Sequence, residues 1–274
     1  MRVFKIGLVR RRRSTSTTPS AVILAAGRGS RLGALTDSAP KCLAVVGGST
    51  LIDHQLDALA AAGVDDITVV TGYRSAAVRR VVGPRARYVH NPDWSMTNSL
   101  YSLRLACHQG ATWIGDDVIV LNCDVLFHPD ALNRVIDAGP NRFAVDRHGG
   151  LGAEEMHVVL DGQRLVEMSK KIPISRVDGE NVGMVRLSQK TLAAVLHAAD
   201  ELVAAGDRTA WMASAIDRVA ADHPLHAVDI SDLPWVEIDY PDDLDRAVQH
   251  VWPAIAVQTA PIDVVVGPRC EVTA

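Results

Sequence analysis

Short apolar runs that alternate with segments of helical spacing constrain the fold of this chain most strongly. Ala21–Ala26 and Ile67–Thr71 are each closed by a glycine, and Asp117–Asn122 is a third such run. Apolar runs of this length are typical of strands that are buried on both faces. Leu51–Ala60 and Asn98–His108 have helical spacing and lie between the runs. This alternation predicts βαβ units and a parallel sheet with helices on both faces.

The second half of the chain has a different texture, with shorter strands that are typical of an antiparallel meander. A helix and a strand precede residue 146, and helices and strands alternate again near the end. Besides the runs and helical segments above and a short strand over 87–90, the predicted elements are helix 130–138, strands 142–146, 157–160, 164–169 and 182–187, helices 189–205 and 209–221, strands 226–230 and 235–239, and a helix from about 241. We therefore expect an α/β fold with a mostly parallel sheet and a small antiparallel extension.

Charge divides the 274 residues unevenly. Residues 1–20 hold six basic residues and no acidic one, so the rest carries 22 of the 28 basic side chains and all 32 acidic ones, a net charge of −10. We predict a basic N-terminal tail over 1–20, one domain over 21–252 and a C-terminal tail over 253–274. The first segment could be a disordered tail, an overlong start or a phosphate-binding arm. The acidic body argues against nucleic acid as a partner.

The cysteines and the hydropathy pattern bear on the compartment. Cys42, Cys107, Cys123 and Cys270 form no C-x-x-C pair, which is typical of reduced thiols and predicts the cytoplasm. No apolar run approaches the roughly 18–20 residues that a membrane span needs, so we expect no membrane association. The arginine run follows the first apolar residues, which is the reverse of a secretory signal.

A glycine-rich turn follows the first apolar run. Gly27, Gly29 and Ser30 alternate with Arg28 and Arg31. Glycines allow the backbone to approach a polyphosphate, and exposed N–H groups favour anions. The turn lacks the third glycine of the dinucleotide motif and the G-K-[ST] of the Walker motif. A phosphate-binding loop and a plain turn with surface arginines both remain open from this pattern alone.

Leu24-Ala25-Ala26-Gly27-Arg28-Gly29-Ser30-Arg31-Leu32, followed by Pro40-Lys41, resembles the signature of the nucleotidyltransferases of the MobA-like and sugar-nucleotide type. The resemblance implies a Rossmann-like fold of the GT-A type, and an enzyme that couples a nucleoside triphosphate to a phosphorylated small molecule and releases pyrophosphate. It implies that Arg31 and Lys41 neutralise the triphosphate. The nucleotide-binding residues that it implies are Leu24, Ala25, Ala26, Gly27, Arg28, Gly29, Ser30, Gly72, Tyr73, Asn98 and Ser99.

Two aspartates follow apolar strands. Asp124 comes after Val118–Asn122, and Asp239 ends Trp235–Ile238. Carboxylates at the ends of such strands lie where open α/β sheets bind ligands, and two of them could share one Mg²⁺. The resemblance supports this assignment, since N-C-D-V-L-F and E-I-D-x-x-x-D-L are similar to family motifs. A helix N-cap is the alternative for each aspartate.

The segment Asn91-Pro92-Asp93-Trp94, followed by Thr97–Leu103, resembles cytidylyltransferases that act on phosphocholine and small phosphonates. The match continues at Ser169–Ile172 and at Gly179–Gly183. It implies that Lys170 contacts the phosphorus oxyanion of the acceptor. A solvated lysine pair is the alternative, and Asn98 could instead be an N-cap.

Glu180, Tyr101 and Trp211 are the remaining acceptor candidates. Glu180 could face a cationic end of the acceptor or lie in a turn. A quaternary ammonium favours an aromatic cage, but Met212 and Ala213 follow Trp211 where relatives often carry an acidic residue. An uncharged phosphonate therefore stays open as the acceptor.

The proposed nucleophile is a phosphate or phosphonate oxygen that is already anionic, so no strong general base is needed. The work is to hold two polyanions together and align them. We predict a Mg²⁺-dependent cytidylyltransferase that takes CTP and a small phosphate or phosphonate, with catalytic residues Arg31, Lys41, Asp124 and Lys170. A sugar-1-phosphate nucleotidyltransferase and a non-catalytic nucleotide-binding regulator are the alternatives. A homodimer is one option for its assembly.

Overall fold

The computed structural model of the protein describes residues 18–109, 117–148, 152 and 154–259. Most of the predicted basic tail and the last fifteen residues lie outside this part of the chain. No helix in the described ranges is both long enough and apolar enough to span a membrane.

The first half of the chain builds the parallel part of a nine-stranded sheet. β1 (Ser20–Ala25) lies between β4 (Ile67–Thr71) and β6 (Val118–Asn122), with β5 (Arg87–His90) beyond β4, and all these pairs are parallel. Every residue of β1 is buried, as expected for a strand with helices on both faces. The carboxyl ends of β1, β4 and β6 therefore meet at one edge of the sheet.

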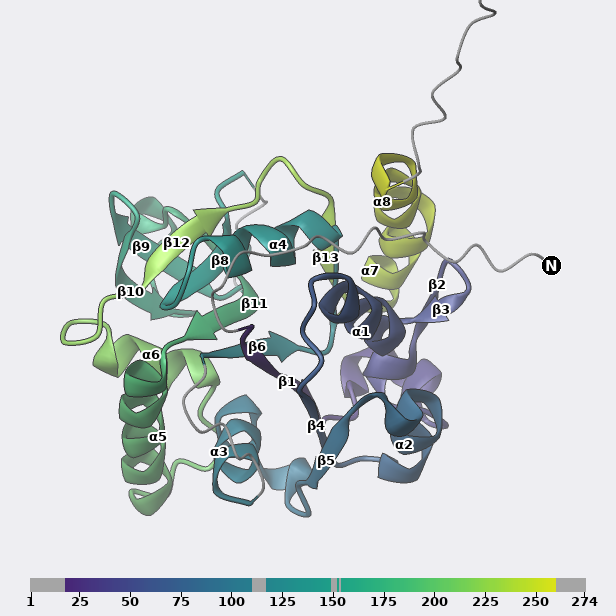
Figure 1. The fold of residues 1–274 in the computed structure, drawn as a ribbon, viewed down its shortest axis with the longest axis horizontal. Helices are drawn as coiled ribbons and strands as arrows, with labels where there is room; N and C mark the ends of the chain where they lie inside the picture. Colours follow the sequence, from purple (N-terminus) through teal and green to yellow (C-terminus); the bar gives the residue numbers. More distant parts are fainter. Residues whose placement is uncertain (1–17, 110–116, 149–151, 153, 260–274) are drawn as a thin grey trace, which may run out of the picture.

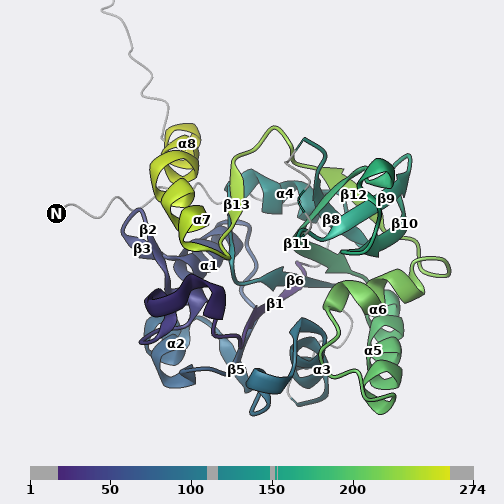
Figure 2. The ribbon, with the colours of Figure 1, turned by 180° about the vertical axis from the view of Figure 1, so that it is seen from behind.

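Helices cover both faces of this sheet (Figures 1 and 2). Because side chains alternate along a strand, Ile23 packs in one apolar cluster and Leu24 in the other. The first cluster includes residues of α1 (Leu51–Ala61), α2 (Ser75–Val82) and α4 (Pro129–Asp137). The second includes residues of α3 (Ser99–Gln109), α5 (Gln189–Ala204) and α6 (Met212–Val219). The predicted helical layers are thus present.

The prediction of a mostly parallel sheet with a small antiparallel extension is wrong, because the sheet is mixed. β11 (Gly179–Leu187) runs antiparallel to both β6 and β8 (Arg142–Asp146). β12 (His226–Asp229), β10 (Arg164–Ser169) and β9 (His157–Asp161) follow β8 in the sheet, and β9 returns to pair with β11. These five strands form a barrel-like ring. Its strands are antiparallel where short turns replace helical crossovers, as between β9 and β10.

A separate layer forms at one end of the molecule. β7 (Val125–Phe127) pairs with β13 (Trp235–Glu237), and β2 (Val45–Val46) pairs with β3 (Ser49–Thr50). The C-terminal helices α7 (Pro241–Arg246) and α8 (Trp252–Thr259) are joined by a π-helical turn over Ala247–Val251 and lie beside these strands (Figure 1). The short 3₁₀ turns of the fold are η1 (Ser30–Thr36), η2 (Lys41–Leu43), η3 (Gly83–Arg85), η4 (Trp94–Met96) and η5 (Ile174–Arg176).

The predicted C-terminal tail is wrong for residues 253–259, which are helical. Ile255 is only 1% exposed and packs in a third apolar cluster with Leu32 and Val46. Pro253 breaks the sequence pattern, and it directly follows the π-helical turn over Ala247–Val251, where the regular hydrogen-bond ladder that a proline cannot continue is already interrupted.

Candidate active site

The cavity at the carboxyl ends of β1 and β6 has a volume of about 350 Å³. Predicted nucleotide-binding residues and predicted acceptor-binding residues both contribute to its wall. The sequence-predicted residues that line it are Leu24, Ala26, Gly27, Gly29, Ser30, Arg31, Lys41, Asn98, Ser99, Asp124, Lys170, Trp211 and Asp239. The structure thus brings together most of the predicted site, including all four predicted catalytic residues.

The glycine-rich turn packs directly against the lysine that follows it in the motif. Gly29 has φ +77°, and a Cβ at this position would lie 2.5 Å from the Cβ of Lys41. The backbone N–H of Lys41 donates to the carbonyl of Arg28 over 3.1 Å. Only glycine can therefore occupy position 29 without moving Lys41, since the conformation is left-handed and the space is filled.

Lys41 lies between two carboxylates. Its side chain is largely buried, and its Nζ is 2.8 Å from Oδ2 of Asp124 and also pairs with Asp239. Burial disfavours the charged ammonium, but the two carboxylates outweigh this effect and raise the pKa of Lys41. Lys41 is therefore a fixed positive charge at neutral pH.

Arg31 is a second cation beside Asp239, in addition to Lys41. Its guanidinium lies 2.8 Å from Asp239 and 3.2 Å from the carboxylate of Glu154, and it sits 5.7 Å from the ring centre of Tyr240. Burial opposes ionisation of Asp239, but Lys41 and then Arg31 hold the pKa of this carboxyl below its usual range. Two cations thus converge on Asp239.

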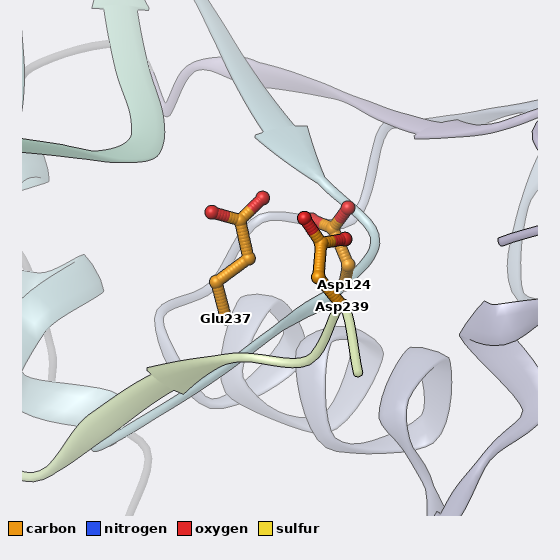
Figure 3. Close-up of side chains that lie close together, drawn as sticks. All are labelled: Asp124, Glu237 and Asp239. Atoms are coloured by element: carbon orange, nitrogen blue, oxygen red, sulfur yellow. The ribbon is translucent and has the colours of Figure 1, made fainter. Parts of the chain in front are cut away.

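Three carboxylates form one cluster in the cavity. Asp124, Glu237 and Asp239 each offer an oxygen within 4.8 Å of the others, and their side chains extend from the same side of the β7–β13 pair (Figure 3). The N–H of Ile238 donates to the carbonyl of Asp124 over 3.0 Å. This pairing brings the end of β13 against the turn after β6.

Sequence reasoning missed Glu237. Glu237 and Asp239 are two residues apart in an extended segment, and so they point to the same side. That period of two was visible in the E-I-D motif. Burial first, and then the charges of Asp124 and Asp239, raise the pKa of Glu237 to about 8.

The carboxylate cluster fits a hard divalent cation. Mg²⁺ prefers oxygen ligands, and three carboxylates supply them. Oδ1 of Asp124 is buried and has no hydrogen-bond partner among the residues described. Burial of a carboxylate oxygen without a partner costs free energy, so a cation or a hydrogen-bond donor beside this atom would stabilise it.

Lys170 and Trp211 form the wall of the cavity on the side of the barrel-like ring. Lys170 follows the last residue of β10, and its Nζ lies 4.9 Å from the ring centre of Trp211. The same Nζ donates to the carbonyl of Glu154. Trp211 is 40% exposed and lines the cavity.

Four predicted nucleotide-binding residues do not line the cavity. Ala25 points to the opposite face of β1. Gly72 backs onto Ala26 and Trp94. The hydroxyl of Tyr73 donates to the carbonyls of Thr36 and Asp37, and Arg28 pairs with Asp37 over 2.5 Å. Tyr73 and Arg28 thus connect the glycine-rich turn to Thr36 and Asp37, outside the cavity wall.

Two predicted acceptor residues also lie outside the cavity wall. Tyr101 points its hydroxyl at Asp93, 3.2 Å away. Glu180 is 6% exposed at the start of β11, and burial, then Glu155 and Asp146, raise its pKa to about 8. Asn98 lines the cavity while its side chain accepts from the N–H of Ser99 over 2.8 Å. The wall also includes residues that were not predicted as site residues: Asn91, Trp94, Asn122 and Asn181, which belong to the quoted motifs, and Met156, which belongs to none.

Open α/β folds bind their ligands at the carboxyl ends of the strands, where this chain gathers its cations and carboxylates. Residues 21–199 match the MobA-like NTP transferase domain. The chain therefore belongs to this family of nucleotidyltransferases, which confirms the resemblance found in the sequence.

Two curated relatives are 33% and 30% identical to this chain over the aligned part. The CMP-5'-(3-aminopropyl)phosphonate synthase of Streptomyces rubellomurinus is 33% identical in an alignment of 244 positions that covers 83% of this chain and 38% of that protein. The bifunctional IPC transferase and DIPP synthase of Rubrobacter xylanophilus is 30% identical over 84% of this chain and 51% of that protein. The chain thus spans less than two thirds of the length of either relative.

Solved structures share the fold. The inositol-1-phosphate CTP transferase from T. maritima has a TM-score of 0.71 at 21% identity, covering 93% of this chain and 99% of that one. The CTP:phosphocholine cytidylyltransferase from Streptococcus pneumoniae has a TM-score of 0.67 at 20% identity, covering 83% and 96%.

Proposed function

We propose that the protein is a cytidylyltransferase that transfers CMP from CTP to a small phosphate or phosphonate and releases pyrophosphate. The acceptor would be of the phosphocholine, 2-aminoethylphosphonate or 2-hydroxyethylphosphonate type. The observation that carries the proposal is the convergence of Arg31, Lys41 and Lys170 with three carboxylates on one cavity. Two polyanions must meet there, and this arrangement offers fixed positive charge for both.

The reaction forms a bond between an acceptor oxygen and the α-phosphorus of CTP, while the bond to pyrophosphate breaks. In the proposed arrangement Arg31 and Lys41 bind the triphosphate and Lys170 binds the acceptor oxyanion. These cations act by alignment and by charge stabilisation, as is typical of phosphoryl and nucleotidyl transfer. No side chain has to remove a proton, because the acceptor oxygen is already ionised.

Asp124 and Asp239 are the proposed ligands of Mg²⁺, and Glu237 lies within reach of the same ion. When bound, Mg²⁺ supplies positive charge beside the phosphate oxygens. The ammonium of Lys41 now occupies the space between the two aspartates and holds the two carboxylates close together.

The choice of CTP rests on the Asn91–Leu103 segment and on the relatives. Proteins named as CTP:phosphoglutamine, 2-aminoethylphosphonate and choline-phosphate cytidylyltransferases are 27%, 33% and 36% identical over 189, 121 and 88 residues. A glucose-1-phosphate thymidylyltransferase of Streptomyces antibioticus is 31% identical over 101 residues. A sugar-1-phosphate nucleotidyltransferase that uses UTP, dTTP or GTP is therefore the second candidate.

The test is to incubate the purified protein and MgCl₂ with each triphosphate and each acceptor, and to measure pyrophosphate. We expect release with CTP and a small phosphate or phosphonate. Release only with dTTP or UTP and a hexose 1-phosphate would favour the second candidate. Binding of CTP without release under any pairing would indicate a nucleotide-binding regulator. Lys41→Ala and Asp124→Ala are expected to abolish turnover without loss of the folded state.

A further inference from the structure

The connection between α5 and α6 carries Trp211 to the cavity and is fastened to α3. The N–H of Met212 donates to Oγ of Ser99 over 2.9 Å, and the N–H of Asn98 donates to the carbonyl of Arg208 over 3.3 Å. Ser99 therefore caps the start of α6, although it belongs to a different helix. The segment with Trp211 depends on contacts with α3 for its position.

Three side chains form a second link between the α5–α6 connection and the region of α3. Arg208 lies 2.5 Å from Oδ2 of Asp93, and the hydroxyl of Tyr101 donates to the same oxygen over 3.2 Å. The guanidinium of Arg208 also lies 4.8 Å from the ring centre of Tyr101, which is a cation–π contact. We call these three residues the Asp93 clamp.

Asp93 itself is held by the turn before α3. Its N–H donates to Oδ1 of Asn91, a side chain that is 1% exposed. The amide group of Asn91 in turn donates to Thr97 and Ser102. Asn91, Thr97 and Ser102 line the cavity beside Asn98, so the clamp is anchored in the wall that the nucleotide would face.

We propose that the Asp93 clamp is a positioning device that couples the two substrate ends of the cavity. This inference rests on the proposed function, in which Asn98 faces the nucleotide while Lys170 and Trp211 face the acceptor. Arg208 is three residues before Trp211, and Trp211 stacks with Lys170. Release of Arg208 from Asp93 would let the Trp211 segment move, and Lys170 would lose its aromatic neighbour. None of the three clamp residues has to touch a substrate.

The test compares Arg208→Gln, Asp93→Asn and Tyr101→Phe with the unaltered protein in steady-state kinetics. Tyr101→Phe removes only the hydroxyl and keeps the ring. We expect Arg208→Gln and Asp93→Asn to raise KM for the acceptor up to about fivefold, the upper end of what an exposed ion pair contributes, with KM for CTP changed less than about twofold. The Tyr101→Phe/Arg208→Gln double variant should be no worse than Arg208→Gln, because both groups act on one oxygen.

Arg104→Gln is the matched control. Arg104 also lies near the Tyr101 ring, 6.0 Å from its centre, but it pairs with Asp200 over 2.5 Å and not with Asp93. We expect it to leave both KM values unchanged. Equal rises in KM for CTP and for the acceptor, or no rise in any clamp variant, would contradict the proposed positioning role of the Asp93 clamp. An unaltered protein without CTP-dependent pyrophosphate release would instead overturn the proposed function.

Discussion

Lys41 holds an ammonium group between Asp124 and Asp239 in a largely buried part of the cavity. We predict that Lys41→Met lowers the free energy of unfolding by about 3 kcal/mol at pH 7, because it leaves two partly buried carboxylates without the buried ammonium that pairs with both. The low pKa of Asp239 contributes stability above the usual carboxyl range, and this contribution is lost as pH falls through its folded value. The difference between the two proteins should therefore shrink from pH 7 to pH 3.

Urea unfolding in EDTA over this pH range measures the effect. Lys190→Met is the control, since Lys190 is exposed on the first turn of α5 and should change stability little at any pH. A constant difference between the Lys41 variant and the unaltered protein would contradict the assigned ion pair.

Glu180 gives a pH dependence of the opposite sign. Its pKa is raised to about 8 in the folded protein, first by burial and then by Glu155 and Asp146, against roughly 4.3 when unfolded. The folded state thus binds the extra proton, and stability is lost as pH rises from about 4.3 to 8. Glu180→Gln cannot ionise, so its melting temperature should rise relative to the unaltered protein across this range. Glu201→Gln, on an exposed side chain, should show no such trend.

Single residues were predictable from sequence where a motif fixed their place. Arg31, Lys41, Asp124 and Asp239 meet in the cavity as expected, because each follows a recognisable turn or strand end. Tyr101 lies outside it because its position on α3 turns the side chain toward Asp93. Helix phase at this precision depends on tertiary packing, which the sequence pattern does not contain.

At the scale of elements, the glycine-rich turn and η2 behave as one unit. We predict that Gly29→Ala lowers kcat at least tenfold, because its Cβ would displace Lys41. Gly33→Ala is the matched control: Gly33 also has positive φ, +60°, but a Cβ there meets nothing within 4 Å. Backbone strain should cost Gly29→Ala about 1 kcal/mol of stability and Gly33→Ala about 2–3 kcal/mol, since φ +60° with ψ −132° is a conformation that nearly only glycine adopts. Only Gly29→Ala should lose most of its turnover.

Strand positions were predictable because buried strands are short and apolar, as Ile67–Thr71 is in both the prediction and the structure. Strand partners were not. The return of β9 to β11 joins residues about 20 apart through turns whose direction local sequence does not specify. The mixed sheet is therefore a result of pairing, and hydrophobic periodicity reports burial only.

At the scale of the whole molecule, α8 supports the site from a distance. Ile255 packs in the same apolar cluster as Leu32, the neighbour of Arg31. We predict that Ile255→Ala lowers the free energy of unfolding by about 2–4 kcal/mol through the cavity that it leaves. Val257→Ala, on a side chain that is 77% exposed, is the control and should change it by less than about 0.5 kcal/mol. Equal melting temperatures for the two variants would refute this packing role.

The ring formed by β11, β8, β12, β10 and β9 has a consequence for self-association. Because β9 turns back to β11, the nine-stranded sheet keeps a single open edge in the described part of the chain, at β5. Arg87 lies on that edge strand, exposed and paired with Asp66, and charges on an edge hinder the addition of a foreign strand. A strand from another molecule could therefore extend this sheet only at β5, and the charged pair Arg87–Asp66 at that edge opposes such pairing, which is the first step toward fibrils.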